Sequence, residues 1–233
     1  MDETLSGVGV LDKAMSVLRA VEAGARTLAQ LVEATGLHRA TAHRLAGALV
    51  VHGLLRRDED GRYLPGLGLL ALARSAAESL PLAEVAQPVL DELRDVTAES
   101  AQLFVRDGDR RVCVAAAESP HGLRTIVAVG AALELGRGSA GHVLQAERPV
   151  LARGWCASVA EREAGVASVS APVLDGPRVV AAVSVSGPVD RTGRDPGSRY
   201  APAVVAAARR LETAAGLLPA APGVAGDARV SRS

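Results

Sequence analysis

The chain has few cysteines, no net charge and no long apolar segment. Its two cysteines, Cys113 and Cys156, are too few for a disulfide framework and lack the spacing of a metal site. No apolar run is long enough to span a membrane, and no secretory signal is recognisable. We therefore expect a cytoplasmic protein that carries no metal or cofactor and does not enter a membrane.

Basic and acidic residues are balanced, with 26 Lys and Arg against 26 Asp and Glu. Composition alone therefore does not indicate a nucleic-acid partner. Any affinity for DNA must come from where the arginines lie, and a single copy of the chain would bind weakly, which favours a homodimer on two half-sites. At 233 residues and 48% hydrophobic, the chain is long enough for two domains with separate cores.

The stretch TLAQLVEATGLHRATAHRLAGAL, residues 27–49, predicts two short helices joined by a glycine turn. Leu28, Leu31 and Val32 recur at helical spacing, and Gly36 follows where a positive φ is easily adopted. A second apolar stripe then comprises Ala42, Leu45, Ala46 and Leu49. Small and basic residues occupy the opposite face, with no acidic residue between Gly36 and Asp58. This pattern predicts a helix-turn-helix whose second helix enters a DNA major groove.

The flanking residues make this prediction more specific. An amphipathic helix is predicted over residues 10–23, and two short strands, Leu54–Arg57 and Arg62–Leu64, are predicted around the turn Asp60-Gly61. Together they predict a winged helix-turn-helix; the alternative is a small helical bundle with an ordinary hairpin. The residues expected to contact double-stranded DNA are Arg39, Ala40, Thr41, His43, Arg44, Arg56, Arg57 and Arg62. Within this set, Arg39 and His43 are expected at base edges, and Arg44 and Arg57 at phosphates.

The chain is expected to divide near Pro65. The predicted parts are a winged domain (1–65), a linker helix (66–80), an effector-binding domain (81–218) and a disordered tail (219–233). The linker, LGLLALARSAAESL, is apolar enough to pack against a copy of itself, and packing against its own domain is the alternative.

The second half of the chain predicts an antiparallel sheet flanked by helices. Helices are expected over Pro81–Thr97, after Gly138 and over Ala201–Leu217, and strands over Ser100–Val105, Arg111–Ala117, Thr125–Val129 and, as a pair, within Val166–Ser186; Gly154–Gly165 is expected to be irregular. The predicted fold class is α+β: a winged helix-turn-helix followed by a GAF-like effector domain, the layout of a small-molecule sensor.

The paired strands indicate a pocket floor. If the turn Asp175-Gly176-Pro177 leaves Leu174 opposite Arg178, then Ser168 lies opposite Ser184 and Val166 opposite Ser186. One face then carries Ser168, Ser170, Ser184 and Ser186, and the other carries Val169, Val173, Val179, Val183 and Val185. A sheet with valines on its core side and serines on the other suits a solvated cavity.

The segment Gly136–Gly141 matches the pattern G-x-G-x-x-G, with Glu161 further along the chain. A dinucleotide fold needs a strand directly before such a loop and a parallel strand that ends at the acid, and neither is predicted here. The glycines instead suggest exposed N–H groups at a helix start, where a carboxylate would be favoured. The alternative is a tight turn with no ligand.

These motifs resemble the IclR family of transcriptional regulators over nearly the whole chain. The likeness is carried by LAQLVEATGLHRATAHRLAGAL, GRGSAGHVLQA, GWCASVAEREAGVASVSAPV and VVAAVSVSGP. Three segments, GVGVLDKAMSVL, DVTAESAQLF and GVASVSAPV, further resemble short actinobacterial members that control amino-acid biosynthesis genes, notably those for leucine. The resemblance implies a repressor-like regulator that binds DNA as a homodimer, often paired into a homotetramer, and a C-terminal domain that binds a small effector.

The effector is expected to be a small carboxylate, such as an amino, keto or hydroxy acid of branched-chain metabolism. Its expected contacts are Gly138, Ser139, Ala140, Ser168, Ser184, Ser186, Leu133 and Leu135. The chain departs from its relatives at Ser158, where many have an acid, and at Ser168, where many have a cysteine. It also has only a short segment between Ala146 and Gly154, where relatives have a longer helical excursion.

Two other classes of function compete with this interpretation. A small hydrolase could use Ser139 or Ser184 with His121, His142 or Cys156, but the chain has no G-x-S-x-G elbow, so we expect no catalytic residues. A sensor that acts only through protein contacts would keep the second domain and would not need the arginines around His43.

Overall fold

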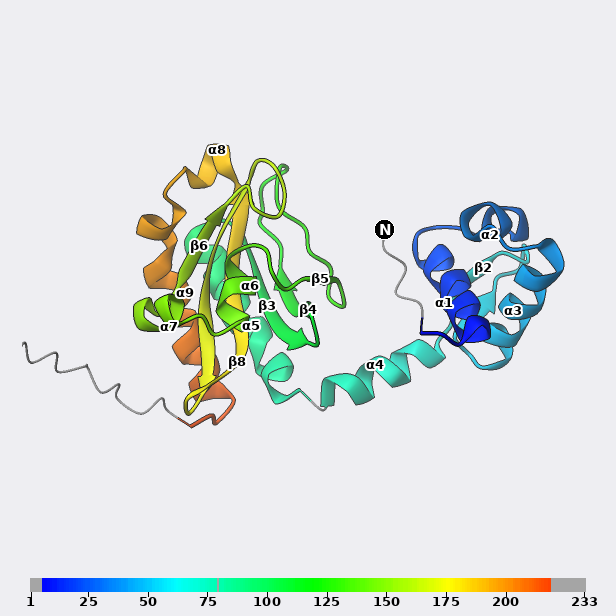
Figure 1. Cartoon of the computed structure of the whole chain (residues 1–233), viewed down its shortest axis with the longest axis horizontal. Coiled ribbons are helices and arrows are strands. Elements are labelled where there is room, and N and C mark those ends of the chain that lie inside the picture. The colour runs from blue at the N-terminus through cyan, green and yellow to red at the C-terminus, as the bar shows by residue number, and fades with distance from the viewer. Residues whose placement is uncertain (1–5, 79, 219–233) are drawn as a thin grey trace, which may run out of the picture. The chain divides into compact units, whose positions relative to one another are not determined.

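The structure, a computed structural model, describes residues 6–78 and 80–218 and divides into two compact units, residues 1–79 and 80–233 (Figure 1). The expected linker helix belongs to the first unit. The expected disordered tail, residues 219–233, lies outside the described residues. No helix in the described part of the chain combines the length and apolarity that crossing a bilayer requires.

The first unit is a helix-turn-helix followed by a hairpin and a further helix. Its elements are α1 (Gly9–Glu22), α2 (Leu28–Thr35), α3 (Arg39–Val51), β1 (Leu55–Arg57), β2 (Tyr63–Pro65) and α4 (Gly68–Glu78). The antiparallel pairing of β1 and β2, with Arg56 opposite Leu64, confirms the predicted wing.

Local signals explain why these helices begin and end where they do. Thr27 and Gln30 form a capping box at the start of α2, in which each side chain accepts a hydrogen bond from the other's backbone N–H. Gly36 ends α2 at φ 66°, the left-handed conformation expected from the sequence. The apolar stripes of all three helices and the hairpin then meet in one core that includes Val17, Leu31, Leu45, Leu49, Leu55 and Tyr63.

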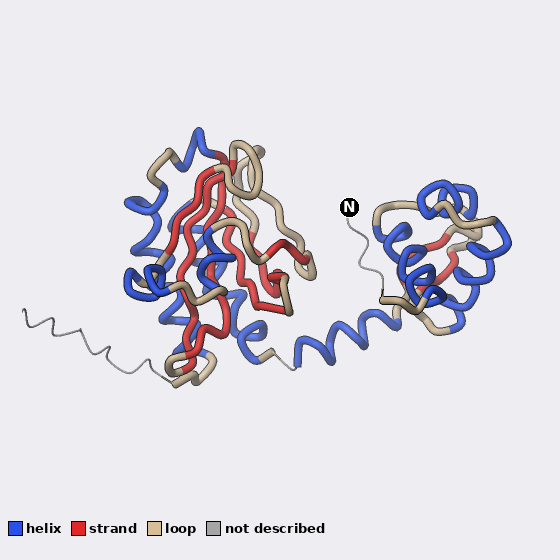
Figure 2. The backbone as a smooth tube through the Cα atoms, in the orientation of Figure 1, coloured by secondary structure: helices blue, strands red, loops and turns tan. Residues whose placement is uncertain are grey.

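The second unit is an antiparallel sheet with helices on both faces (Figure 2). Its elements are α5 (Pro81–Thr97), β3 (Ser100–Asp107), β4 (Arg110–Ala117), β5 (Ala132–Glu134), α6 (Ser139–Leu144), α7 (Arg148–Arg153), β6 (Cys156–Val159), β7 (Val166–Asp175), β8 (Arg178–Pro188), α8 (Val189–Thr192) and α9 (Pro196–Ala214). The strand order is β5-β4-β3-β8-β7-β6. The α+β fold class is thereby confirmed.

Two separate cores fill the two faces of the sheet. On one face, α5 and α9 pack on a layer of small apolar side chains that includes Leu103, Val169 and Val183. On the other face, α6 and α7 pack with Phe104 and Cys113 in a smaller cluster. The remainder of this second face holds the serines, so it is the face that can form a polar site.

Two β-bulges determine which side chains reach the second face. Leu103 pairs with Ala115 but Phe104 pairs with Cys113, so β4 contains one extra residue, Val114. As a result Ala115 and Ala117 join the α5–α9 core, whereas Cys113 packs on the opposite face. The second bulge lies in β8. Leu174 pairs with Val179 but Val173 pairs with Ala181, so β8 contains one extra residue between these two pairs.

Several sequence predictions in this unit were wrong. Ser168 pairs with Ser186 and Ser170 with Ser184, two residues away from the predicted register. One residue of this shift arises because Asp175 rather than Leu174 faces Arg178 across a tighter turn, and the other arises from the bulge in β8. The serines still share one face, since a shift of two keeps the alternation. Val179 was misplaced: the bulge moves it to the cluster around Phe104, away from Val183.

Some predicted element boundaries also need correction. Residues 125–129 form no strand, and β5 lies further along at Ala132–Glu134, where it pairs with β4. The segment expected to be irregular contains β6, which pairs with the edge of β7. The closing helix α9 begins at Pro196 rather than Ala201, because Asp195 caps it by accepting a hydrogen bond from the Ser198 N–H.

Candidate functional sites

Helix α3 presents the predicted DNA-contacting residues on its outer face. Arg39, Ala40, His43 and Arg44 are exposed, whereas Ala42, Leu45, Ala46 and Leu49 are buried. Thr41 is half-buried. Among the described residues, no carboxylate lies within ion-pair distance of Arg39 or Arg44. The outer face of α3 is therefore a small, uncompensated basic surface of the kind that fits a major groove.

The hairpin adds three exposed arginines beside this helix in the same unit. Arg57 is held by its own strand partner: its Nη2 donates to the Tyr63 hydroxyl at 2.5 Å, and its guanidinium stacks 4.7 Å from the Tyr63 ring centroid. Arg62 lies 3.6 Å from Asp60 in an exposed ion pair, which offsets part of its charge. Arg56 is exposed on β1. Arg56 and Arg57 are therefore better placed than Arg62 to offer charge to a phosphate.

A small cavity lies on the serine face of the second unit. Its volume is about 30 Å³, which is room for about two water molecules. It is lined by Gln102, Phe104, Arg111, Val127, Leu133, Gly138, Ser139, Ala140, Ser158, Arg162, Val166, Ser168, Ser184 and Ser186. Seven of the eight residues predicted to hold an effector are in this lining; Leu135 is not, because it packs into the cluster around Phe104.

The serine hydroxyls on this face form a continuous hydrogen-bonded chain. The Ser139 Oγ lies 2.7 Å from both the Ser168 Oγ and the Ser170 Oγ. The chain continues from Ser168 to the Ser158 hydroxyl at 3.0 Å and from Ser170 to the Ser184 hydroxyl at 2.8 Å. Each hydroxyl can donate one hydrogen bond and accept two, so the chain satisfies itself without a ligand and can also rearrange around one.

Arg111 also lines the cavity, although no pattern in the sequence marks it as a site residue. Its side chain comes from β4, is 3% exposed, and lies with its guanidinium carbon 5.5 Å from the Phe104 ring centroid. One terminal nitrogen, Nη1, donates to the Arg137 carbonyl, but Nε is buried without a hydrogen-bond partner. Burial, and secondarily the nearby charge of Arg162, lowers the pKa of Arg111 to about 10.

The glycines of the GRGSAG segment make room for this arginine. A Cβ at Gly141 would lie 2.1 Å from the Leu135 carbonyl oxygen and 2.7 Å from Arg111 Nη1. Both distances are too short for a real contact, so only glycine fits at this position. Gly138 has φ +78°, and a Cβ there would stand 3.4 Å from Arg111 Nη2. The segment is therefore neither a dinucleotide loop nor a simple turn: its glycines allow the backbone to approach a buried cation.

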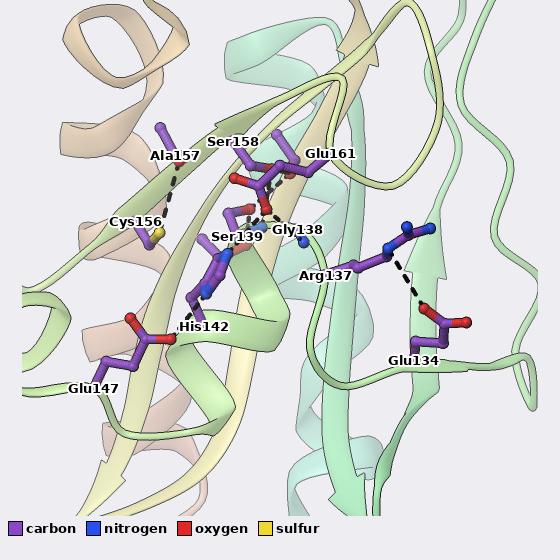
Figure 3. A network of polar contacts seen from close by, with 12 residues as sticks. Glu134, Arg137, Gly138, Ser139, His142, Glu147, Cys156, Ala157, Ser158 and Glu161 are labelled. Atoms are coloured by element: carbon purple, nitrogen blue, oxygen red, sulfur yellow. Dashed lines mark hydrogen bonds and ion pairs between the residues drawn. The ribbon is translucent and has the colours of Figure 1, made fainter.

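Two of the loop N–H groups that were expected to meet a carboxylate, those of Gly138 and Ser139, already have partners within the chain. Gly138 donates to the carboxylate of Glu161 at 2.9 Å, and Ser139 donates to the Ser158 hydroxyl at 3.0 Å. Figure 3 shows Glu161 reaching from the segment after β6 to this loop and to His142. The expectation that the loop N–H groups are free for a ligand was therefore wrong for Gly138 and Ser139.

His142 connects two carboxylates beside the loop. Its Nδ1 lies 2.9 Å from Glu147 and its Nε2 lies 2.9 Å from Glu161 (Figure 3). Only the protonated ring can donate from both nitrogens, and the hydrogen bond to Glu147, followed by that to Glu161, raises the pKa of His142. Because both ring nitrogens face carboxylates, His142 is not placed to activate a serine, and the hydrolase alternative loses its most plausible base.

The raised pKa of His142 predicts a pH-dependent stability. The folded state binds this proton more tightly than the unfolded chain, so the stabilisation is complete below about pH 6.5 and is lost as pH rises through the folded-state value. Urea unfolding of the wild type should therefore show a free energy of unfolding that falls as the pH rises above about 6.5. In His142→Gln this decrease should be smaller. His121→Gln, which alters an exposed imidazole outside the cluster, should leave the fall unchanged. A fall of equal size in His142→Gln would contradict this assignment.

The arrangement of these parts defines a class of protein. A winged helix-turn-helix precedes a sheet domain with a polar cavity, which is the organisation of a DNA-binding transcriptional regulator. Residues 10–59 match the model of the IclR helix-turn-helix domain, and residues 74–151 and 148–213 match the model of the bacterial transcriptional regulator IclR C-terminal domain. The chain belongs to the IclR family.

Relatives and solved structures agree with this assignment. The glycerol operon regulatory protein of Streptomyces griseus is 30% identical over 216 residues, which cover 78% of this chain and 85% of that protein. The crystal structure of a proposed transcriptional regulator from Rhodococcus sp. RHA1 is 28% identical, with a TM-score of 0.72 and coverage of 90% and 98%. An IclR homologue from Microbacterium hydrocarbonoxydans, solved with 4-hydroxybenzoate, shares the fold at 22% identity, with a TM-score of 0.73 and coverage of 89% and 99%.

Proposed function

We propose that this regulator binds a specific operator through α3 and the hairpin, and that a small carboxylate in the cavity of the second unit modulates this binding. The observation that carries the proposal is the pairing, in one chain, of an exposed basic recognition helix with a buried cavity that contains a cation and a chain of hydroxyls. The cavity supplies what a carboxylate with a second polar group requires, namely a positive charge and hydrogen-bonding groups.

The DNA contacts divide by position on the first unit. Arg39, Ala40, Thr41 and His43 lie at the start of α3, where side chains of a recognition helix approach base edges. Arg44, Arg56 and Arg57 carry charge without a nearby carboxylate among the described residues and are assigned to phosphates. Arg62 remains in the proposed set with a weaker role, because Asp60 offsets its charge.

The protein is proposed to act as a homodimer. The family resemblance implies that two such dimers often pair into a tetramer. Helix α4 leaves Leu70 and Leu72 more than half exposed, at 68% and 61%, and Leu67 just before it is 70% exposed. Exposed leucines at this density mark an interaction surface, and a second copy of the chain would bury it. Two copies would also place two recognition helices on a two-fold symmetric operator.

The effector is proposed to belong to amino-acid metabolism, with the protein acting in the cytoplasm as a repressor of the corresponding biosynthesis genes. The carboxylate class is supported by Arg111 in the cavity and by the 4-hydroxybenzoate, itself a carboxylate, bound to the Microbacterium homologue. The amino-acid pathway is supported only by the sequence resemblance of GVGVLDKAMSVL, DVTAESAQLF and GVASVSAPV. A sensor that works only through protein contacts is disfavoured by the uncompensated arginines of α3.

Selection of bound fragments from random double-stranded DNA tests the DNA-binding function directly. We expect the wild type to enrich one palindromic sequence whose half-sites lie about one helical turn, or a multiple of it, apart. Enrichment of unrelated sequences with equal affinity, or no retention of DNA, would contradict the proposed function and favour a sensor acting through protein contacts.

A further inference from the structure

Arg111 carries a buried charge for which the described part of the chain provides no counterion. Its side chain is 3% exposed, and among the described residues no carboxylate comes within ion-pair distance of it. The nearby acids are engaged elsewhere, since Glu161 binds Gly138 and His142 and Glu134 binds Arg137. A second arginine, Arg162, also lines the cavity and adds to the positive charge. An unpaired buried charge is costly, so its retention in a cavity indicates a role outside folding.

The free hydrogen-bonding edge of Arg111 identifies what the cavity is built to bind. Nη1 is held by the Arg137 carbonyl, while Nε lies buried in the cavity wall without an acceptor. We propose that Arg111 is the carboxylate-binding residue of the effector site and that its Nε edge binds the ligand's carboxylate. This inference rests on the proposed effector function and changes its anchor to Arg111 from the Gly138 loop, where the N–H groups of Gly138 and Ser139 are already bonded.

The serines of the cavity lining are suited to bind a second polar group of the ligand. Ser139, Ser168 and Ser184 line the cavity and at present bond to one another or to Ser170, and Gln102 accepts a hydrogen bond from Ser186 at 3.1 Å. A hydroxyl, keto or amino group on the ligand can replace these mutual bonds. Because the cavity of about 30 Å³ has room for only about two water molecules, side chains of the lining must move when such a ligand binds. The class is a small carboxylate with one further polar group.

A purely structural role for Arg111 makes a different prediction about stability. If the guanidinium served only to hold the Arg137 carbonyl and stack on Phe104, its removal would lower the unfolding temperature by several degrees. If the guanidinium instead serves to bind a ligand, Arg111→Met removes an unpaired buried charge. The unliganded variant should then unfold at the wild-type temperature or above. Thermal unfolding without ligand separates the two roles.

Calorimetric titration with matched acids and amides tests the binding role. The probes are lactate, 2-oxoisovalerate and 4-hydroxybenzoate, each beside its neutral amide. We expect the wild type to bind at least one acid in preference to its amide. Arg111→Gln should lower the affinity for that acid by about 10- to 100-fold and leave the affinity for the amide little changed. Arg110→Gln, an exposed arginine on the same strand, serves as the matched control and should behave as the wild type.

The outcomes separate this inference from the proposed function. Binding of amides as well as acids, unchanged acid binding in Arg111→Gln, absence of binding by every acid, or a destabilised Arg111→Met would each overturn the role of Arg111. The proposed DNA-binding function would stand in all four cases if the wild type still selects a palindromic operator. Failure of that selection would remove the DNA-binding function whatever Arg111 binds.

Discussion

Replacing Arg39 and Arg44 together by alanine should reduce operator affinity by at least about 100-fold. Each lost base or phosphate contact costs about 1–3 kcal/mol, and a dimer loses every contact twice. Both side chains are exposed on α3, away from the buried stripe of Leu45 and Leu49, so the fold should be unaffected. Fluorescence anisotropy of a labelled operator, with circular dichroism to verify folding, measures the effect.

The single variants should differ in kind. Arg39→Ala should relax sequence preference, whereas Arg44→Ala should lower affinity on every sequence and reduce its salt dependence. An Arg106→Ala, Arg110→Ala double variant removes two exposed arginines from the second unit and should bind as the wild type does. If Arg44→Ala changed sequence preference and left non-specific binding intact, the division between base and phosphate contacts would be wrong.

Ser184→Leu should abolish the response to effector and leave operator binding intact. Ser184 is 2% exposed, lines the cavity and bonds to Ser170, so a leucine would fill the space that the ligand needs. Overpacking of this kind costs about 1–3 kcal/mol of stability. The measurement is operator anisotropy with and without the effector acid, on protein verified to be folded.

Val183→Leu is the matched control for this variant. Val183 is the neighbouring residue on β8 and faces the core under α5 and α9, so a leucine there imposes a similar packing cost on the other face of the sheet. We expect Val183→Leu to keep the effector response that Ser184→Leu loses. Loss of the response in both variants would show that it depends on the stability of the sheet and not on the cavity.

The sequence predicted the first unit well because its signals are local. The glycine turn at Gly36, the apolar stripe ending at Leu49 and the Asp60-Gly61 turn act within a few residues of one another. The helices and hairpin therefore lie within a few residues of their predicted positions. Helix α5 likewise spans its predicted range, because Pro81 favours a helix start and the apolar period continues to Thr97.

The effector cavity was predicted only in part because its geometry depends on long-range pairing. Alternation along β4 would place Arg111, Ala115 and Ala117 on one face, and only the bulge at Val114 separates them. The extra residue in β8 displaced Val179 in the same way. Glu161 reaches Gly138 through a loop whose course no periodicity describes, so neither the occupied N–H groups nor the buried guanidinium was visible in the sequence.

The central claim is that carboxylate binding and operator binding are coupled. The direct measurement is the affinity of the wild type for its selected operator, in saturating effector acid and without it, paired with the affinity for the acid, with and without operator. Coupling predicts that the acid shifts operator affinity by about 5- to 150-fold and that the operator shifts acid affinity by the same factor. Operator affinity that is unchanged at saturating acid would contradict the claim.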